Sequence, residues 1–233
     1  MNMRPRPTIG PLLGLVSVVL LVLGNELTKV GGSSPPLHGS AEEYVQAIGS
    51  SPVVLVGVYL AVLAWLALGA FFLTVAEEVR SRRGDPRAAR HLGASAVLVA
   101  AVGITGAPPL LAATVMAGDG DLSPQVAKGL LLLNAAVFPL SWLLVAIAMA
   151  LAAVQLSRLA MMEPWLCRSG MVLAAVLAAG SLGVWWAEAF MMVWLLALIW
   201  IGISSVVLTR RAMRSTSDNS REVPVTADGS ARP

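Results

Sequence analysis

Cysteine, histidine and charged residues are all scarce in this chain of 233 residues. Its single cysteine, Cys167, excludes an internal disulfide and any metal site built from several cysteines. The two histidines, His38 and His91, fall in segments expected on opposite sides of a membrane, which excludes a haem held by two histidines. HExxH, GxSxG and P-loop motifs are also absent, so the signatures of common metalloproteases, serine hydrolases and nucleotide-binding enzymes are missing.

Apolar sequence is what the chain has in quantity. Hydrophobic residues make up 57% of it and charged residues only 12%, where a soluble domain is nearer a quarter charged. The apolar residues come in runs near 20, long enough for a helix to cross roughly 30 Å of hydrocarbon. Spanning segments must pair their own backbone groups, and alternating strand patterns are absent. The sequence therefore predicts an all-α polytopic membrane protein.

Six spans are predicted to form one antiparallel bundle, a single transmembrane domain over residues 1–209. The segment 169–209 holds 41 largely apolar residues, which as one helix would extend about 62 Å, twice the hydrocarbon core. It is therefore expected to break near Glu188, beside two tryptophans. Residues 210–233 are rich in Ser, Asp and Arg and are predicted to be a disordered cytoplasmic tail. The predicted spans are 9–23, 52–76, 92–117, 129–157, 169–186 and 189–209.

The first apolar run allows two interpretations. Arg4 and Arg6 precede it as they would in a signal peptide, but the bulky Val22 and the lack of an Ala-x-Ala site favour a retained span. Gly10 and Gly14 form a GxxxG pair, which lets another helix approach closely.

A short extra helix is predicted in the polar connection between the first two spans. Ser40 followed by Glu43 forms a capping box that opens a helix from residue 41 to about 48. Tyr44, Val45 and Ile48 then share one side. We expect this helix either to lie at the outer membrane surface, with the tyrosine at the headgroup level, or to cover the bundle as a lid.

Prolines mark both helix starts and a break. Proline at the first helical position loses no hydrogen bond, and a preceding Ser or Asp can cap the free amides. Within the third span, Pro108 and Pro109 remove two amide donors, so a kink or break is expected there. The predicted helix starts are Ser51-Pro52, Asp85-Pro86, Ser123-Pro124 and Glu163-Pro164.

The segment 77–91, EEVRSRRGDPRAARH, indicates the orientation of the bundle. Basic residues concentrate in cytoplasmic loops, and with six spans the predicted inner segments hold 14 of the 16 Lys and Arg residues. The protein is therefore predicted to lie in the inner (cytoplasmic) membrane of a cell, with both termini on the cytoplasmic side. The segment is expected to contact anionic lipid headgroups rather than nucleic acid, since topology alone accounts for its charge. The predicted contacts are Arg80, Arg82, Arg83, Arg87 and Arg90.

No ionisable residue is expected near the middle of a span, which is where membrane catalysis or ion coupling normally places one. We therefore assign no catalytic residue, no cofactor and no metal. The best candidate for a ligand pocket is the break at Pro108 and Pro109, together with the polar residues Asn134 and Ser141, because broken helices can line cavities. A kink that only shapes the bundle, with Asn134 joining two helices, is the simpler interpretation.

The span plan, the outer segment EEYVQAI and the arginine-rich connection resemble the uncharacterised small six-span membrane proteins of GC-rich bacteria. That resemblance implies no catalytic motif. The leading hypothesis is a non-enzymatic membrane-accessory or interaction component. The alternative is a small transporter or a protein that binds a lipophilic ligand near Pro108 and Pro109, and a solvent-connected polar cavity there would favour it. A membrane enzyme is the least favoured class, for want of a nucleophile–base pair.

Overall fold

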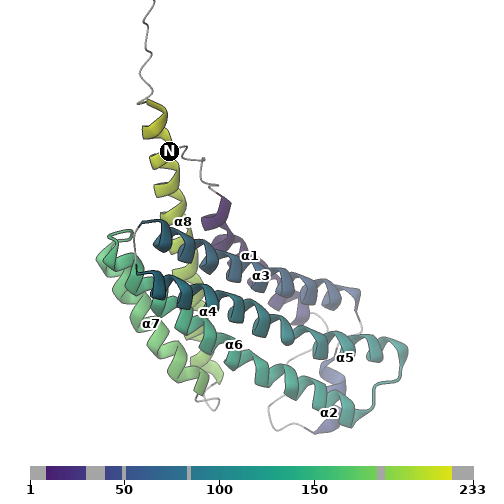
Figure 1. Ribbon diagram of the computed structural model, residues 1–233. Helices are drawn as coiled ribbons and strands as arrows, with labels where there is room; N and C mark the ends of the chain where they lie inside the picture. The colour runs from purple at the N-terminus through teal and green to yellow at the C-terminus, as the bar shows by residue number, and fades with distance from the viewer. Residues whose placement is uncertain (1–8, 30–39, 49–50, 83–84, 183–186, 222–233) are drawn as a thin grey trace, which may run out of the picture.

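The computed structural model describes residues 9–29, 40–48, 51–82, 85–182 and 187–221, and the regular secondary structure in these ranges is all α-helix (Figure 1). Within these ranges six helices are long and apolar enough to cross a membrane, with α4 and α5 together forming one interrupted span. The predicted all-α class with six spans and a short extra helix is confirmed. The helices are α1 (Ile9–Lys29), α2 (Ala41–Ala47), α3 (Pro52–Ser81), α4 (Pro86–Thr105), α5 (Ala107–Asp119), α6 (Pro124–Arg158), α7 (Pro164–Leu182) and α8 (Ala187–Arg221).

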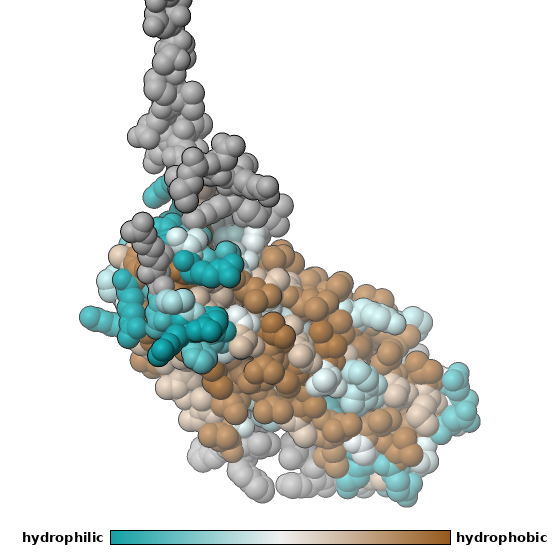
Figure 2. Space-filling view, viewed as in Figure 1, coloured by the Kyte–Doolittle hydropathy of each residue, from teal (hydrophilic) through white to brown (hydrophobic). Residues whose placement is uncertain are grey.

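The spans form a closed ring in which each helix packs against the next one along the chain. The neighbours in order are α1, α3, α4, α6, α7 and α8, and α8 returns to pack against α1. Figure 2 shows apolar surface along the sides of the bundle and polar surface gathered at its ends. We call the end that carries Arg80, Arg82, Arg87 and Arg90 the basic end, and the other the α2 end. The start of α1 and the end of α8 both lie at the basic end (Figure 1).

The proline-marked helix starts are confirmed. Helices α3, α4, α6 and α7 begin at the four prolines. Ser51 and Asp85 each accept a hydrogen bond from the amide two residues on, at 3.3 and 2.8 Å, and Ser123 accepts one from the amide three residues on, at 3.4 Å. Before α7 it is the backbone carbonyl of Glu163 that accepts, from two amides of the first turn. The caps satisfy donors that the first turn of a helix leaves free.

The helices run further than the predicted spans. Helix α1 continues to Lys29, and α7 begins at Pro164 rather than at residue 169. The sequence predicts that the helix of the second span continues past residue 76 to about residue 83, and α3 does continue, to Ser81. A disordered tail is predicted from residue 210; α8 continues as a helix to Arg221, and residues 222–233 lie outside the described ranges. A backbone that is already helical can keep its internal hydrogen bonds past the hydrocarbon, where water and ion pairs solvate its polar side chains.

Glycines allow the closest helix crossing, that of α1 on α3. A Cβ atom on Gly24 would stand 2.9 Å from the carbonyl oxygen of Gly57, and one on Gly57 would stand 2.9 Å from the carbonyl of Gly24. The predicted GxxxG pair belongs to the same contact: Cβ atoms on Gly10 and Gly14 would lie 2.6 and 2.8 Å from side chains of α3. Such small residues let backbones approach without a driving force from water.

Two polar ties hold α8 to its neighbours. The hydroxyl of Ser205 accepts a hydrogen bond from the amide of Leu15 at 3.0 Å and donates one to the carbonyl of Pro11, so it stands inside the hydrogen-bond ladder of α1. On the other side, the indole Nε1–H of Trp200 donates to the carbonyl of Leu166 on α7 at 2.8 Å, and this bond is buried. These ties close the ring at its last helix.

The short helix α2 packs against α5 and α6 at the end of the bundle opposite the basic end. Ser40 caps it by accepting a hydrogen bond from the amide of Glu43 at 3.3 Å, as the capping box predicts. Tyr44 is buried and packs with Ile48 against alanines of α5 and α6. The ammonium group of Lys128 lies over the Tyr44 ring, 5.7 Å from its centroid. Helix α2 therefore packs against one side of this end, and its placement at the membrane surface or as a lid over the bundle stays a prediction.

Candidate functional site

An aromatic cluster occupies the middle of the ring. Trp142 of α6 is fully buried, and its ring lies 5.5 Å from that of Trp65 on α3 and 5.9 Å from that of Trp194 on α8, measured between centroids. Phe138, one turn before Trp142, packs edge-on against it at 6.2 Å. The indole N–H groups of Trp142 and Trp194 are buried and have no hydrogen-bond partner in the described part of the chain. Buried indole N–H groups normally find a partner, so these two stand out.

A cavity of about 150 Å³ lies beside this cluster, between six helices. Helices α1, α3 and α6 each contribute several side chains, the junction of α4 and α5 contributes backbone and small side chains, and α8 contributes one tryptophan. The lining residues are Leu21, Gly24, Asn25, Thr28, Val58, Ala61, Val62, Trp65, Gly103, Gly106, Ala107, Leu110, Asn134, Val137, Phe138, Ser141 and Trp194.

Burial of the lining residues changes along the bundle axis. On α1, α3, α4, α6 and α8 the lining residue nearest the basic end is buried, and these form the floor of the cavity: Leu21, Trp65, Gly103, Ser141 and Trp194. Towards the α2 end most of the lining is only half-buried, including Asn25, Thr28 and Asn134, and Phe138 is 37% exposed. The cavity therefore has a closed aromatic floor and a more open mouth towards the α2 end.

Gly103 makes the floor possible. A Cβ atom at this position would stand 2.2 Å from Cδ2 of Trp65, so the indole ring lies directly against the backbone of α4. Any larger residue at Gly103 would push the Trp65 ring out of its place between α4 and Trp142.

The proline break lies beside the cavity, as the sequence predicts, but the prolines do not line it. Helix α4 ends at Thr105 and α5 restarts at Ala107. Pro108 is exposed and Pro109 is buried, and neither is among the lining residues. The carbonyl at the break, that of Gly106, faces α6 instead and accepts a hydrogen bond of 2.7 Å from Nδ2 of Asn134.

Asn134 therefore has two sides. One N–H ties α6 to the break, which is the interhelical role that intramembrane Asn usually plays. The residue also lines the cavity, and an amide has, besides the N–H already bonded, an acceptor oxygen (Oδ1) and a second N–H donor. Ser141 lines the floor, and its hydroxyl donates to the carbonyl of Val137 at 2.9 Å. Two of the four predicted pocket residues thus meet in one cavity.

The sequence reasoning missed the α1 wall. Asn25 lies half-buried in the mouth and its side chain forms no hydrogen bond within the described residues, while the hydroxyl of Thr28 donates to the carbonyl of Asn25 at 2.8 Å. Both residues follow the predicted end of the first span at residue 23, so they were assigned to a loop. Trp65 and Trp194 were missed because an aromatic residue inside an apolar run carries no signal of its own.

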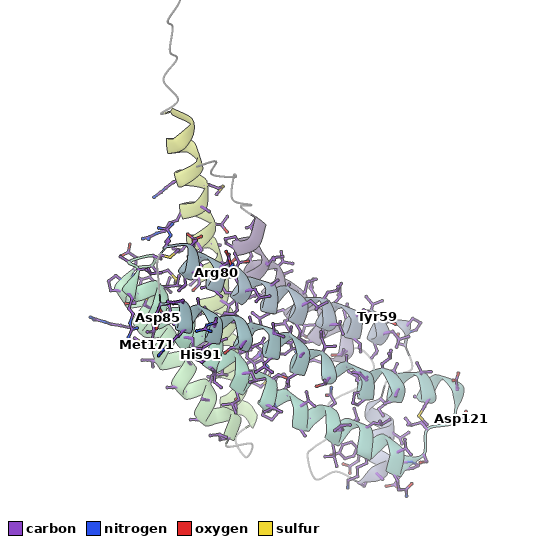
Figure 3. The ribbon with its side chains drawn as sticks, in the orientation of Figure 1. Tyr59, Arg80, Asp85, His91, Asp121 and Met171 are labelled. Atoms are coloured by element: carbon purple, nitrogen blue, oxygen red, sulfur yellow. The ribbon has the colours of Figure 1, made fainter. Side chains whose placement is uncertain are left out.

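The second predicted site, at the basic end, is exposed. Arg80 pairs with Glu77 and Arg82 with Glu78, each at 2.6 Å, as the helical spacing predicts. Arg87 and Arg90 are exposed in the first turns of α4, on the same end of the bundle as Asp85 and His91 (Figure 3). Arg83, the fifth predicted contact, lies outside the described residues. Further exposed arginines at this end are Arg158, Arg168 and Arg210.

Among the described residues, no group of three or more His, Cys, Asp or Glu side chains is placed to hold a metal ion. All the cavity-lining side chains are uncharged. What the cavity offers is an aromatic and aliphatic surface with a few amide and hydroxyl groups. The chain matches no protein-family model, no curated protein and no solved structure, so its function is argued from this geometry.

Proposed function

We propose that this membrane protein binds a small lipophilic molecule in the cavity between α1, α3, α5 and α6. The observation that carries the proposal is the cavity itself, with polar groups at its mouth and tryptophans at its floor. Small-molecule sites are typically concave and mostly apolar, with a few placed polar groups. A component that acted only through its surface would not need such a space, so the cavity favours the ligand-binding alternative over a membrane-accessory role.

Binding accounts for the geometry better than passage does. On the basic side of the floor the ring is filled by completely buried side chains, among them Leu68, Phe71, Phe72 and Met149. Interiors packed in this way leave no room for a solute without a large rearrangement. Within the described residues the cavity is therefore closed towards the basic end, and its less buried side faces the α2 end, which the charge rule predicts to be external.

The test enlarges one side chain of the cavity wall and measures the effect on ligand binding. Ala107→Leu places three more carbon atoms in the lining, whereas Ala112→Leu makes the same change at an exposed position of the same helix. The purified protein in detergent is titrated with benzene-sized solutes, and tryptophan fluorescence is followed. We expect saturable binding to the wild type and to Ala112→Leu. Binding should be at least about tenfold weaker in Ala107→Leu, because the larger side chain occupies space in the cavity that the ligand needs. Equal binding to all three proteins would refute the proposal.

We also propose that the basic end contacts anionic lipid headgroups. The support is the set of exposed arginines, of which Arg87 and Arg90 make no ion pair in the described structure. Each basic residue near an anionic surface contributes about 1 kcal/mol. The thermal stability of the protein in phosphatidylglycerol bilayers should therefore exceed that in phosphatidylcholine, and Arg87→Gln with Arg90→Gln should reduce this difference. Lys29→Gln, at the α2 end, is the control and should leave the difference unchanged.

A further inference from the structure

The chemistry of the cavity wall restricts what can bind, provided that the proposed ligand-binding function holds. All seventeen lining residues are uncharged at neutral pH. An ion moved into such a site would lose its water and gain no counter-charge, which is among the most costly changes in protein interiors. The ligand part that enters the cavity must therefore be uncharged.

The hydrogen bonds already made in the cavity show which groups remain for a ligand. The hydroxyl hydrogens of Thr28 and Ser141 are both donated to carbonyls of their own helices, so these two residues can offer only acceptor oxygens. One N–H of Asn134 is donated to the carbonyl of Gly106. Asn25, in contrast, keeps both its donors and its acceptor, because its side chain is unbonded within the described residues and half-buried in the mouth.

An amide offers a donor and an acceptor side by side, and the group that satisfies both is one that also has both, such as a hydroxyl or another amide. A ligand that covers the half-buried Asn25 removes its amide from water, so a ligand without such a group would leave the amide unpaired and would be disfavoured. The apolar remainder of the ligand would lie deeper, against Trp65 and Trp194. A cavity of about 150 Å³ matches the size at which protein interiors admit a single benzene ring.

We infer that the ligand is uncharged and presents a hydroxyl or amide group to Asn25 and Asn134 at the mouth, with a ring-sized apolar group on the tryptophan floor. Whether this is a free small molecule or the end of a longer lipid, the part recognised has the same chemistry.

Four probes of nearly equal shape test the inference: benzyl alcohol, ethylbenzene, benzoate and benzylammonium. Their affinities are measured by tryptophan fluorescence for the wild type, Asn25→Leu and Asn25→Asp. For each protein we take the ratio of the affinities for two probes, and we compare this ratio between the wild type and a variant. The partition of each probe into the detergent is the same for all proteins and cancels in this comparison. Asn25 holds no other side chain in place, so its substitution should leave the fold intact.

In Asn25→Leu, the affinity for benzyl alcohol relative to ethylbenzene should fall about five- to tenfold, the size expected for one lost hydrogen bond. Asn25→Asp should raise the relative affinity for benzylammonium. An unchanged ratio in Asn25→Leu would overturn the inference. Wild-type binding of benzoate or benzylammonium as tight as that of benzyl alcohol would also overturn it, once each affinity is corrected for the measured partition of that probe into the detergent. Both results leave the proposed function standing, whereas loss of the difference between Ala107→Leu and Ala112→Leu for every probe would remove the proposed function itself.

Discussion

Gly103→Ala should destabilise the protein through one identifiable clash. The new methyl group would stand 2.2 Å from Cδ2 of Trp65, whose buried ring is held in turn by Trp142 at 5.5 Å between centroids. Overpacking in a filled core costs about 1–3 kcal/mol. The control lies on the same helix: a Cβ on Gly93 would meet nothing nearer than 4.0 Å. Any gain in helix propensity, about 0.5–1 kcal/mol, is common to both variants and cancels in their difference.

The assay is the free energy of unfolding in mixed micelles, measured by titration with a denaturing detergent. Gly93→Ala should be as stable as the wild type or slightly more stable, and Gly103→Ala should lie below Gly93→Ala by about 1–3 kcal/mol. The tryptophan emission of folded Gly103→Ala should also change, because Trp65 must move. Equal unfolding free energies for the two variants would refute the reasoning, since they would mean that the floor of the cavity yields to an extra methyl group without cost.

Two further pairs of residues, both on α8, separate bonded from unbonded polar groups in the same unfolding assay. Trp200→Phe deletes the buried N–H that is bonded to a carbonyl of α7 and should cost about 1–3 kcal/mol more than Trp194→Phe, which deletes an N–H without a partner; equal losses would contradict this. Ser205→Ala removes the tie between α8 and α1 and should cost about 0.6 kcal/mol. Ser204→Ala removes a buried hydroxyl with no partner, so stability should stay the same or rise, and a loss as large as that of Ser205→Ala would show that the hydroxyl is satisfied after all.

Helix starts could be predicted from the sequence because their causes are local. A proline with a fixed φ and an oxygen on the residue before it define the first turn, and Ser51, Asp85 and Ser123 all act in this way in the structure. Helix ends could not be predicted from hydropathy. Apolar composition marks where the hydrocarbon ends, whereas the hydrogen-bond ladder of α1 continues to Lys29 and that of α8 to Arg221.

The candidate site shows the same division between local and non-local information. Asn134 and Ser141 could be singled out because a polar residue at depth needs a reason. That they share a cavity with Asn25 could not, because the contact joins segments more than a hundred residues apart and depends on how α1 crosses α3. The place of Trp65 depends in turn on a glycine of another helix, and no periodicity in either segment indicates that pairing.

The proline break explains why the cavity lies where it does. Pro108 and Pro109 have no amide hydrogen, so the carbonyls four residues before them lose their helical partners and the span must restart. The restart carries Gly106 and Ala107, whose small side chains fill little of the space between α3 and α6. Asn134 then fixes the distance across that space by bonding the carbonyl of Gly106. The kink and the pocket are therefore not competing interpretations of the two prolines. The same break that shapes the bundle places two small residues in one wall of the cavity and binds the amide of Asn134 next to them.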